Sequence, residues 1–483
     1  MKKFSFDLNK NNTTKMLNNK NNIDKLFIES FIESIVPNGF LENNKEFSVE
    51  WDFDVLNEEL KKKIPDTLTN WYSESSSAGN SVEKFKKSFL KYSFIPNYLH
   101  FPKTFDYSIK LNLYSKELGL TTLKSYVPIF ISPYGCASLY GGKSDDMNNV
   151  KGSIEVRVPF SIPALSKYPI EEFSKNLSKD IFYMYQLYMT DDDDINISII
   201  ERAKESNVSV ILLTIDAGAS HGGYPMIKSG SDITYSYAFV GNLLNDIVFN
   251  IKCYENIGYV ATKDNKILSA VSKYLNISLK KLLKKYDEKK SFGYARKVQL
   301  GGMDMQNSST DENSPEYIWS IDNISKICHS NKSLSKYFKY DFKKGVPLVV
   351  KGILTKENAS EAIKCGADGV YVTTHGGRFL HNAIAPLDIL TDIRESVKKI
   401  NKNIGVWYDT GIRSGPDILI AFAKGAEFVG IGRPVMFSNV LYGKDGVSAT
   451  LKQLLYFLKE QAKLCGINNL NNYNQLKNII INE

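Results

Sequence analysis

The sequence predicts an α/β fold, a TIM (β/α)8 barrel, from three observations. Short apolar runs rich in β-branched residues recur between residues 123 and 434, there are eight of them, and amphipathic segments separate most of them. The runs are continuously apolar, which is typical of parallel strands buried on both faces. Eight such strands joined by helices favour a closed barrel. An open doubly wound sheet is the second possibility.

The expected elements follow one another in regular order. The strands are 127–132, 154–160, 181–188, 208–216, 346–353, 369–375, 404–411 and 428–434. The helices are 196–207, 355–367, 386–403, 415–426 and 446–465. Within 355–367, Thr355 is a suitable N-cap and Gly366 stands where a helix would end.

Three further parts complete the chain. Residues 1–45 form an Asn- and Lys-rich extension that we expect to be partly disordered, because such polar tracts bury too little apolar surface to offset the entropy of ordering. Residues 46–470 are expected to form the barrel, including an insertion of about residues 224–345, and residues 471–483 a polar tail. A connection as long as this insertion, placed after the fourth strand, predicts a lid or a small excursion domain on the catalytic face.

Composition excludes several classes of protein. The net charge of +8 is spread along the chain, which argues against a nucleic-acid binder. No apolar run is long enough to span a membrane and the start lacks a signal peptide, so we expect a cytoplasmic protein. A mitochondrial presequence is the less favoured alternative because the basic start contains no arginine. Five scattered cysteines without a C-x-x-C pair predict reduced thiols and no metal site.

Polar residues gather where the predicted strands end, which is where barrels carry their functional groups. They are Gln186, Tyr188, Thr214, Asp216, Lys351, His375, Arg378, Asp409, Arg413 and Arg433. Six strand ends of this kind indicate one active site rather than isolated structural side chains.

Two loops after the last strands predict a phosphate site. The segments DTGIRSG (409–415) and GIGRP (430–434) combine glycines, which let backbone approach an anion, with arginines, which supply charge and forked donors. The residues concerned are Gly411, Arg413, Gly432 and Arg433. Ordinary turns between helix and strand remain the alternative for each loop taken alone.

Taken in order, six segments resemble the FMN-dependent α-hydroxy acid dehydrogenase/oxidase family, which includes glycolate oxidase, lactate oxidase and the flavin domain of flavocytochrome b2. The segments are YQLY (185–188), LTID (213–216), VVKGIL (349–354), THGGR (374–378), DTGIRSG and IGRPVMFS (431–438). The resemblance covers about residues 48–470. It implies a barrel with FMN at its mouth and a flavin that accepts a hydride equivalent from the carbon bearing a hydroxyl.

The chemistry of such a reaction agrees with the residues present. Removing a proton from a 2-hydroxy acid requires a base with a pKa near neutrality, and His375 is the candidate. The resemblance adds Asp216 as the carboxylate that stabilises the imidazolium and Lys351 as the ammonium facing the flavin. Arg378 could grip a substrate carboxylate with its fork.

The remaining contacts are implied by the resemblance alone. Tyr188, together with Trp71 or Tyr72 depending on the alignment, would face the substrate. The cofactor contacts would be Pro133, Gly135, Gln186, Thr214, Lys351, Asp409, Gly411, Arg413, Gly432 and Arg433.

Departures from the family pattern predict an altered substrate. Gly223, two residues after His221, stands where relatives have a second arginine, and Thr374 precedes the base where they have asparagine. We therefore expect a bulkier substrate than glycolate or lactate. The alternative is that a lysine of 280–290 restores the missing charge.

The sequence thus predicts FMN-dependent oxidation of a 2-hydroxy acid or related alcohol, with oxygen or a quinone as electron acceptor. A flavin-binding protein with weak or no turnover, acting through protein contacts, is the second hypothesis. A fused heme domain is not expected, because His100 is the only histidine before residue 221. Homo-oligomer formation is left open.

Overall fold

The computed structural model describes residues 52–73, 80–135, 137–142, 144–217, 240–305, 316–340 and 342–482. The expectation for residues 1–45 concerns a part of the chain outside these ranges. The same holds for His221 and Gly223.

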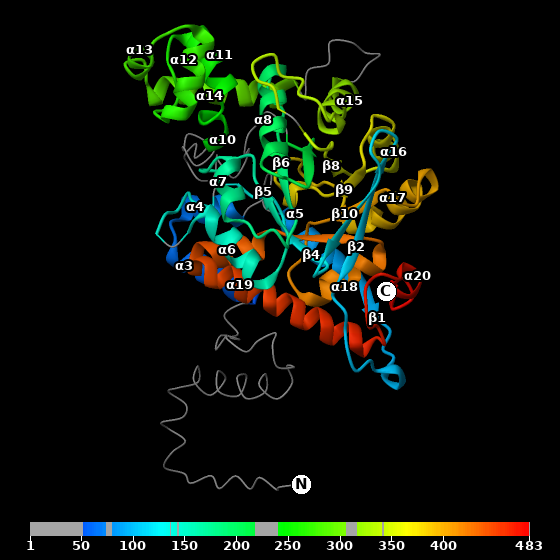
Figure 1. Ribbon diagram of the computed structural model, residues 1–483. Helices are drawn as coiled ribbons and strands as arrows, with labels where there is room; N and C mark the ends of the chain where they lie inside the picture. Colours follow the sequence, from blue (N-terminus) through cyan, green and yellow to red (C-terminus); the bar gives the residue numbers. More distant parts are fainter. Residues whose placement is uncertain are drawn as a thin grey trace, which may run out of the picture.

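The core of the molecule is a closed barrel of eight parallel strands (Figure 1). They are β4 (Ile129–Ile131), β5 (Phe160–Ile162), β6 (Tyr183–Leu187), β7 (Val210–Thr214), β8 (Leu348–Ile353), β9 (Gly369–Val372), β10 (Gly405–Tyr408) and β11 (Phe428–Ile431). Neighbouring strands pair in chain order, and β11 pairs with β4 to close the ring. Closure confirms the TIM barrel and rules out the open sheet.

Helices cover the outside of the barrel, as the alternation of patterns predicts. They are α6 (Asp146–Val156), α7 (Ile170–Asn176), α8 (Asp193–Glu205), α15 (Glu316–His329), α16 (Lys356–Lys364), α17 (Pro386–Ile400), α18 (Gly415–Lys424) and α19 (Arg433–Leu464). None of the helices in the described ranges has both the length and the apolar character needed to cross a bilayer.

Two expected boundaries are wrong. The expected strand 154–160 lies partly in α6, which the Asp145 side chain caps by accepting a hydrogen bond from the Met147 N–H. Arg157, with a φ of 57°, ends this helix, and the strand begins only at Phe160. Helix α19 begins at Arg433, well before the expected residue 446, and continues through a kink at Gly443.

A β-hairpin closes the end of the barrel where the strands begin. It consists of β2 (Ile109–Ser115) and β3 (Gly119–Ser125). Leu113 lies so close to Gly369 and Gly405, the first residues of β9 and β10, that a Cβ on either glycine would be within 3 Å of its Cδ2. Only the opposite end, where the strands terminate, is left for a site.

Within the described residues, the helices α3 (Phe53–Lys63), α4 (Asp66–Ser73) and α5 (Asn80–Lys87) precede the hairpin. Leu56, Leu60 and Tyr72 form a small apolar cluster with Phe437 and Val440 of α19. This packing holds α3 and α4 beside the loops that follow the last strands.

The long connection after β7 contains α10 (Gly241–Leu244), α11 (Ile247–Ile257), α12 (Asn265–Leu275), α13 (Leu279–Leu283) and α14 (Glu288–Met305) before α15. Part of it has an apolar core of its own, which includes Ile251, Leu268 and Leu282. Its attachment to the barrel includes a buried ion pair in which Arg202 of α8 contacts Asp246 at 2.9 Å. In Figure 1, α11 to α14 project beyond the ring of barrel helices.

Candidate active site

A cavity lies at the mouth of the barrel, where the strands end. Most of the residues singled out in the sequence lie in its wall: Tyr72, Pro133, Gly135, Gln186, Tyr188, Lys351, His375, Arg378, Asp409, Gly411, Arg413, Gly432 and Arg433. Thr214 and Asp216 are not part of the wall, but each contacts a residue that is. Thr214 contacts Gln186, and Asp216 contacts His375. The side chain of Trp71 lies outside the described part of the structure, so only Tyr72 can be placed.

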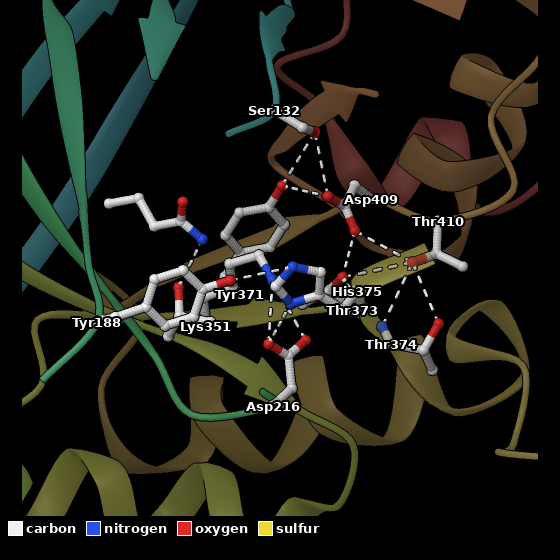
Figure 2. A network of polar contacts seen from close by, with 12 residues as sticks. Ser132, Tyr188, Asp216, Lys351, Tyr371, Thr373, Thr374, His375, Asp409 and Thr410 are labelled. Carbon is white, nitrogen blue, oxygen red and sulfur yellow. Dashed lines mark hydrogen bonds and ion pairs between the residues drawn. The ribbon is translucent and has the colours of Figure 1, made fainter. Parts of the chain in front are cut away.

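Three of these residues form a tight charged cluster (Figure 2). Nδ1 of His375 lies 2.8 Å from Oδ1 of Asp216. The ammonium of Lys351 lies 3.2 Å from each oxygen of the same carboxylate and 3.1 Å from Nδ1. The three groups come from the ends of β9, β7 and β8, which the barrel brings together although 159 residues separate Asp216 from His375.

The surroundings shift the proton equilibria of this cluster. Burial raises the pKa of the Asp216 carboxyl, but the charges of Lys351 and His375 and their hydrogen bonds outweigh it, so the net shift is downward. Burial and the Lys351 ammonium lower the pKa of the His375 imidazole, against the opposing effect of Asp216. The carboxylate is therefore ionised and the imidazole neutral at pH 7.

The other ring nitrogen of His375 belongs to the cavity wall. Nε2 lies 3.2 Å from the hydroxyl of Tyr188. The ring of Phe379 meets the imidazole edge to face, with 4.9 Å between the ring centroids. Because Asp216 holds Nδ1, Nε2 is the nitrogen available to a molecule in the cavity.

The backbone that follows His375 requires glycine. His375, Gly376 and Gly377 all have positive φ values, of 55°, 64° and 78°. A Cβ on Gly376 would lie 2.7 Å from Nη1 of Arg433, which donates to the Gly376 carbonyl at 2.9 Å. The HGG sequence therefore lets His375 and this arginine lie side by side.

Arg413 is a half-buried cation at the predicted phosphate loops. It makes no ion pair with a carboxylate of the described residues, and its Nε has no hydrogen-bond partner among them. Its guanidinium lies 4.2 Å from the centre of the Phe53 ring. Burial lowers its pKa to about 10. A half-buried guanidinium with an unpartnered, inaccessible Nε suits an anion in the cavity.

Sequence reasoning missed a set of hydroxyls around Asp409, namely Ser132, Tyr371, Thr373 and Thr410. Thr410 has a φ of 90°, a conformation that branched residues rarely adopt, and its hydroxyl contacts Thr373 and Thr374 as well. Ser132 directly follows β4, and Thr410 is the second residue after β10. These positions could have indicated them.

Residues 60–479 match the model of a protein family described as FMN-dependent dehydrogenase. The chain belongs to this family. It is similar to the L-lactate oxidase of Lentilactobacillus hilgardii, with 25% identity over 92% of this chain and 98% of that protein. The 2-hydroxyacid oxidase of Dictyostelium discoideum is 23% identical over 87% of each chain.

A solved structure shows the same fold. It is a soluble mutant of the membrane-associated (S)-mandelate dehydrogenase from Pseudomonas putida, with a TM-score of 0.64 and 19% identity over 90% of this chain and 99% of that one. As an FMN-dependent dehydrogenase, the protein is an oxidoreductase with FMN as its cofactor.

The residues that line the cavity fit FMN. The Arg413 Nε described above is a buried donor for a phosphate, and a Cβ on Gly432, at the N-terminus of α19, would meet no atom within 4 Å. Gln186, whose Nε2 donates to Thr214 Oγ1 at 3.1 Å, supplies an amide at the cavity wall. The His, Cys, Asp and Glu side chains of the described residues form no group that could hold a metal ion.

Proposed function

We propose that this FMN-dependent dehydrogenase oxidises a 2-hydroxy acid to the 2-oxo acid, with His375 as the base. The observation that carries the proposal is the His375 imidazole, neutral at pH 7, with Nδ1 held by Asp216 and Nε2 in the cavity wall. The names of the lactate and 2-hydroxyacid oxidases among the relatives support this substrate class. When bound, FMN supplies the two-electron acceptor.

Each charged group has a separate task in this mechanism. His375 takes the substrate proton at Nε2, and the positive charge that forms on the ring is stabilised by the Asp216 carboxylate 2.8 Å from Nδ1. Lys351 keeps that carboxylate ionised and places a positive charge in the cavity wall, where it favours electron transfer to the flavin. Arg378, also in the wall, binds the substrate carboxylate.

The cofactor contacts form the second half of the proposal. Gly411, Arg413, Gly432 and Arg433 hold the phosphate, and Asp409 binds the ribityl chain. Pro133, Gly135, Gln186 and Thr214 complete the cofactor site around the ring system. All of these except Thr214 lie in the cavity wall, and Thr214 acts through its bond to Gln186.

An apolar patch beside the base supports a bulky substrate. Leu165 and Phe379 pack with Ala164, Tyr188 and Ala217, and both line the cavity. The lysines of 280–290 are exposed, and none of them is among the cavity-lining residues. We therefore propose 2-hydroxy acids with an aliphatic or aromatic side chain as the preferred substrates.

Shortening Leu165 tests this preference. In Leu165→Ala, kcat/KM for an aromatic acid such as mandelate should fall roughly tenfold, because apolar contact with the side chain is lost. Glycolate, which has no side chain, is the internal control and should change less than about threefold. An equal loss for both acids would contradict an apolar side-chain site at Leu165.

The pH dependence of flavin reduction tests the base. Protonated His375 cannot accept a proton, so the rate should be constant at neutral pH and fall on the acidic side. Because the pKa of His375 is lowered, the midpoint of this fall should lie below pH 6.5. Asp216→Asn removes the group that raises this pKa, so the midpoint should move to still lower pH. A midpoint that Asp216→Asn moves upward would contradict the assignment.

We propose oxygen or a quinone as the electron acceptor that reoxidises the flavin. Hydrogen peroxide released during turnover, compared with reduction of an artificial quinone, distinguishes the two. A flavin-binding protein without turnover stays the second candidate, but the intact cluster of Asp216, Lys351 and His375 favours the enzyme.

A further inference from the structure

Asp409 is surrounded by hydroxyl groups on both carboxylate oxygens (Figure 2). Oδ2 accepts from Tyr371 at 2.6 Å and from Ser132 at 3.0 Å. Oδ1 accepts from Thr410 at 3.1 Å and from Thr373 in a short bond. A carboxylate has about four acceptor sites, so these four hydroxyls fill it.

The four hydroxyls differ in their access to the cavity. Ser132 and Thr410 lie in the cavity wall beside Asp409. Tyr371 and Thr373 are completely buried and are not part of the wall. A cofactor hydroxyl in the cavity can therefore replace the hydroxyl of Ser132 or Thr410 as a donor to Asp409. The buried hydroxyls of Tyr371 and Thr373 would keep their hydrogen bonds to the carboxylate.

The space that the Tyr371 phenol occupies depends on the absence of a side chain at Gly430 in β11. A Cβ on Gly430 would lie 2.7 Å from the Tyr371 oxygen and 2.3 Å from Ser132 Oγ, so β11 carries no side chain at this point. Burial, followed by the charge of Asp409, raises the pKa of Tyr371 far above its ordinary value. The phenol therefore keeps its proton and acts as a permanent donor to Asp409.

We infer that Tyr371 is a positioning residue for FMN. Its buried hydroxyl holds the Asp409 carboxylate in place, while a cofactor hydroxyl takes over the hydrogen bond that Ser132 or Thr410 donates. The inference rests on the proposed role of Asp409 toward the ribityl chain. The Tyr371 oxygen also lies 3.2 Å from Ser132 Oγ, but in this account Tyr371 influences FMN through the Asp409 carboxylate. Its effect on FMN affinity should therefore depend on that carboxylate.

A double-mutant cycle on FMN affinity tests the inference. The holoenzyme and its variants are diluted, and the FMN released is measured by its fluorescence. Tyr371→Phe should raise the FMN dissociation constant roughly tenfold to a hundredfold, because a hydrogen bond to a charged group is lost. In the Asp409→Ala background the same change should alter the constant less than about twofold.

Tyr183→Phe is the matched control. Its buried phenol also donates to an oxygen, the Ser206 carbonyl, but at the start of β6, away from the cavity. It should leave FMN affinity within about twofold of wild type. If Tyr371→Phe does not fold, Thr373→Val, which removes a donor from the other oxygen of Asp409, is measured in the same cycle.

The outcomes separate the inference from its premise. If Asp409→Ala alone leaves FMN affinity unchanged, the ribityl assignment of Asp409 fails and the inference with it. If Asp409→Ala weakens binding but Tyr371→Phe does not, or if Tyr371→Phe has the same effect in both backgrounds, Tyr371 is not a positioning residue for FMN. A loss of FMN affinity in Tyr371→Phe that disappears in the Asp409→Ala background supports the inference.

Discussion

His375→Gln should slow reduction of the flavin by a 2-hydroxy acid by at least about two orders of magnitude, the usual contribution of a positioned base. FMN should stay bound, because glutamine preserves much of the side-chain volume and the groups proposed to hold the phosphate are untouched. The measurement is anaerobic stopped-flow absorbance of the flavin, with the yellow colour of the purified variant as evidence of cofactor content.

Asp216→Asn provides the control for that result. It should also slow reduction, since in the proposed mechanism Asp216 stabilises the imidazolium through its 2.8 Å contact with Nδ1. Because the two residues act as a unit, the loss in the double variant should be much smaller than the product of the single losses. A wild-type rate of reduction in His375→Gln would show that the base is another residue.

Arg433→Ala should weaken FMN binding roughly tenfold to a hundredfold. The substitution removes a charge-assisted contact from the proposed phosphate site. It also removes the donors to the carbonyls of Gly376, at 2.9 Å, and Tyr72, at 3.2 Å, which connect the loop after His375 to the N-terminal helices. The dissociation constant can be measured by flavin fluorescence on dilution.

Arg394→Ala is the matched control for charge. Arg394 of α17 pairs with Glu427 at 2.8 Å and is not among the residues that line the cavity. Its loss should leave FMN affinity unchanged. An equal effect of the two substitutions, or an unchanged affinity in Arg433→Ala, would remove Arg433 from the cofactor site.

The barrel could be predicted because its strands are continuously apolar and amphipathic helical segments separate most of them. The prediction failed at 154–160, where the apolar residues Ile154 and Val156 fit a buried strand as well as the last turn of a helix. The helix is favoured by the Asp145 cap at its start and by the left-handed conformation of Arg157 at its end. Neither can be read from the sequence of 154–160, because Asp145 lies outside this segment and arginine rarely adopts a left-handed conformation. The kink at Gly443 similarly hid the true start of α19.

The residues of the cavity were predictable where a polar side chain follows a strand. His375, Lys351 and Asp216 are charged or titratable groups at strand ends, so the barrel topology alone brings them to one mouth. Tyr371 is different, because a tyrosine inside an apolar strand is indistinguishable from a core residue. The role inferred for it rests on its contact with Asp409 and on the space left by Gly430, which only the structure shows.

The most direct test of the proposed reaction is reduction of the bound flavin by 2-hydroxy acids in the absence of oxygen. The purified protein is mixed with glycolate, lactate, mandelate and long-chain 2-hydroxy acids, and the flavin absorbance and the 2-oxo product are followed together. We expect the yellow colour to bleach with formation of one 2-oxo acid per flavin, fastest with a large side chain. A protein that holds FMN but is reduced by none of these acids would contradict 2-hydroxy acid oxidation as its function.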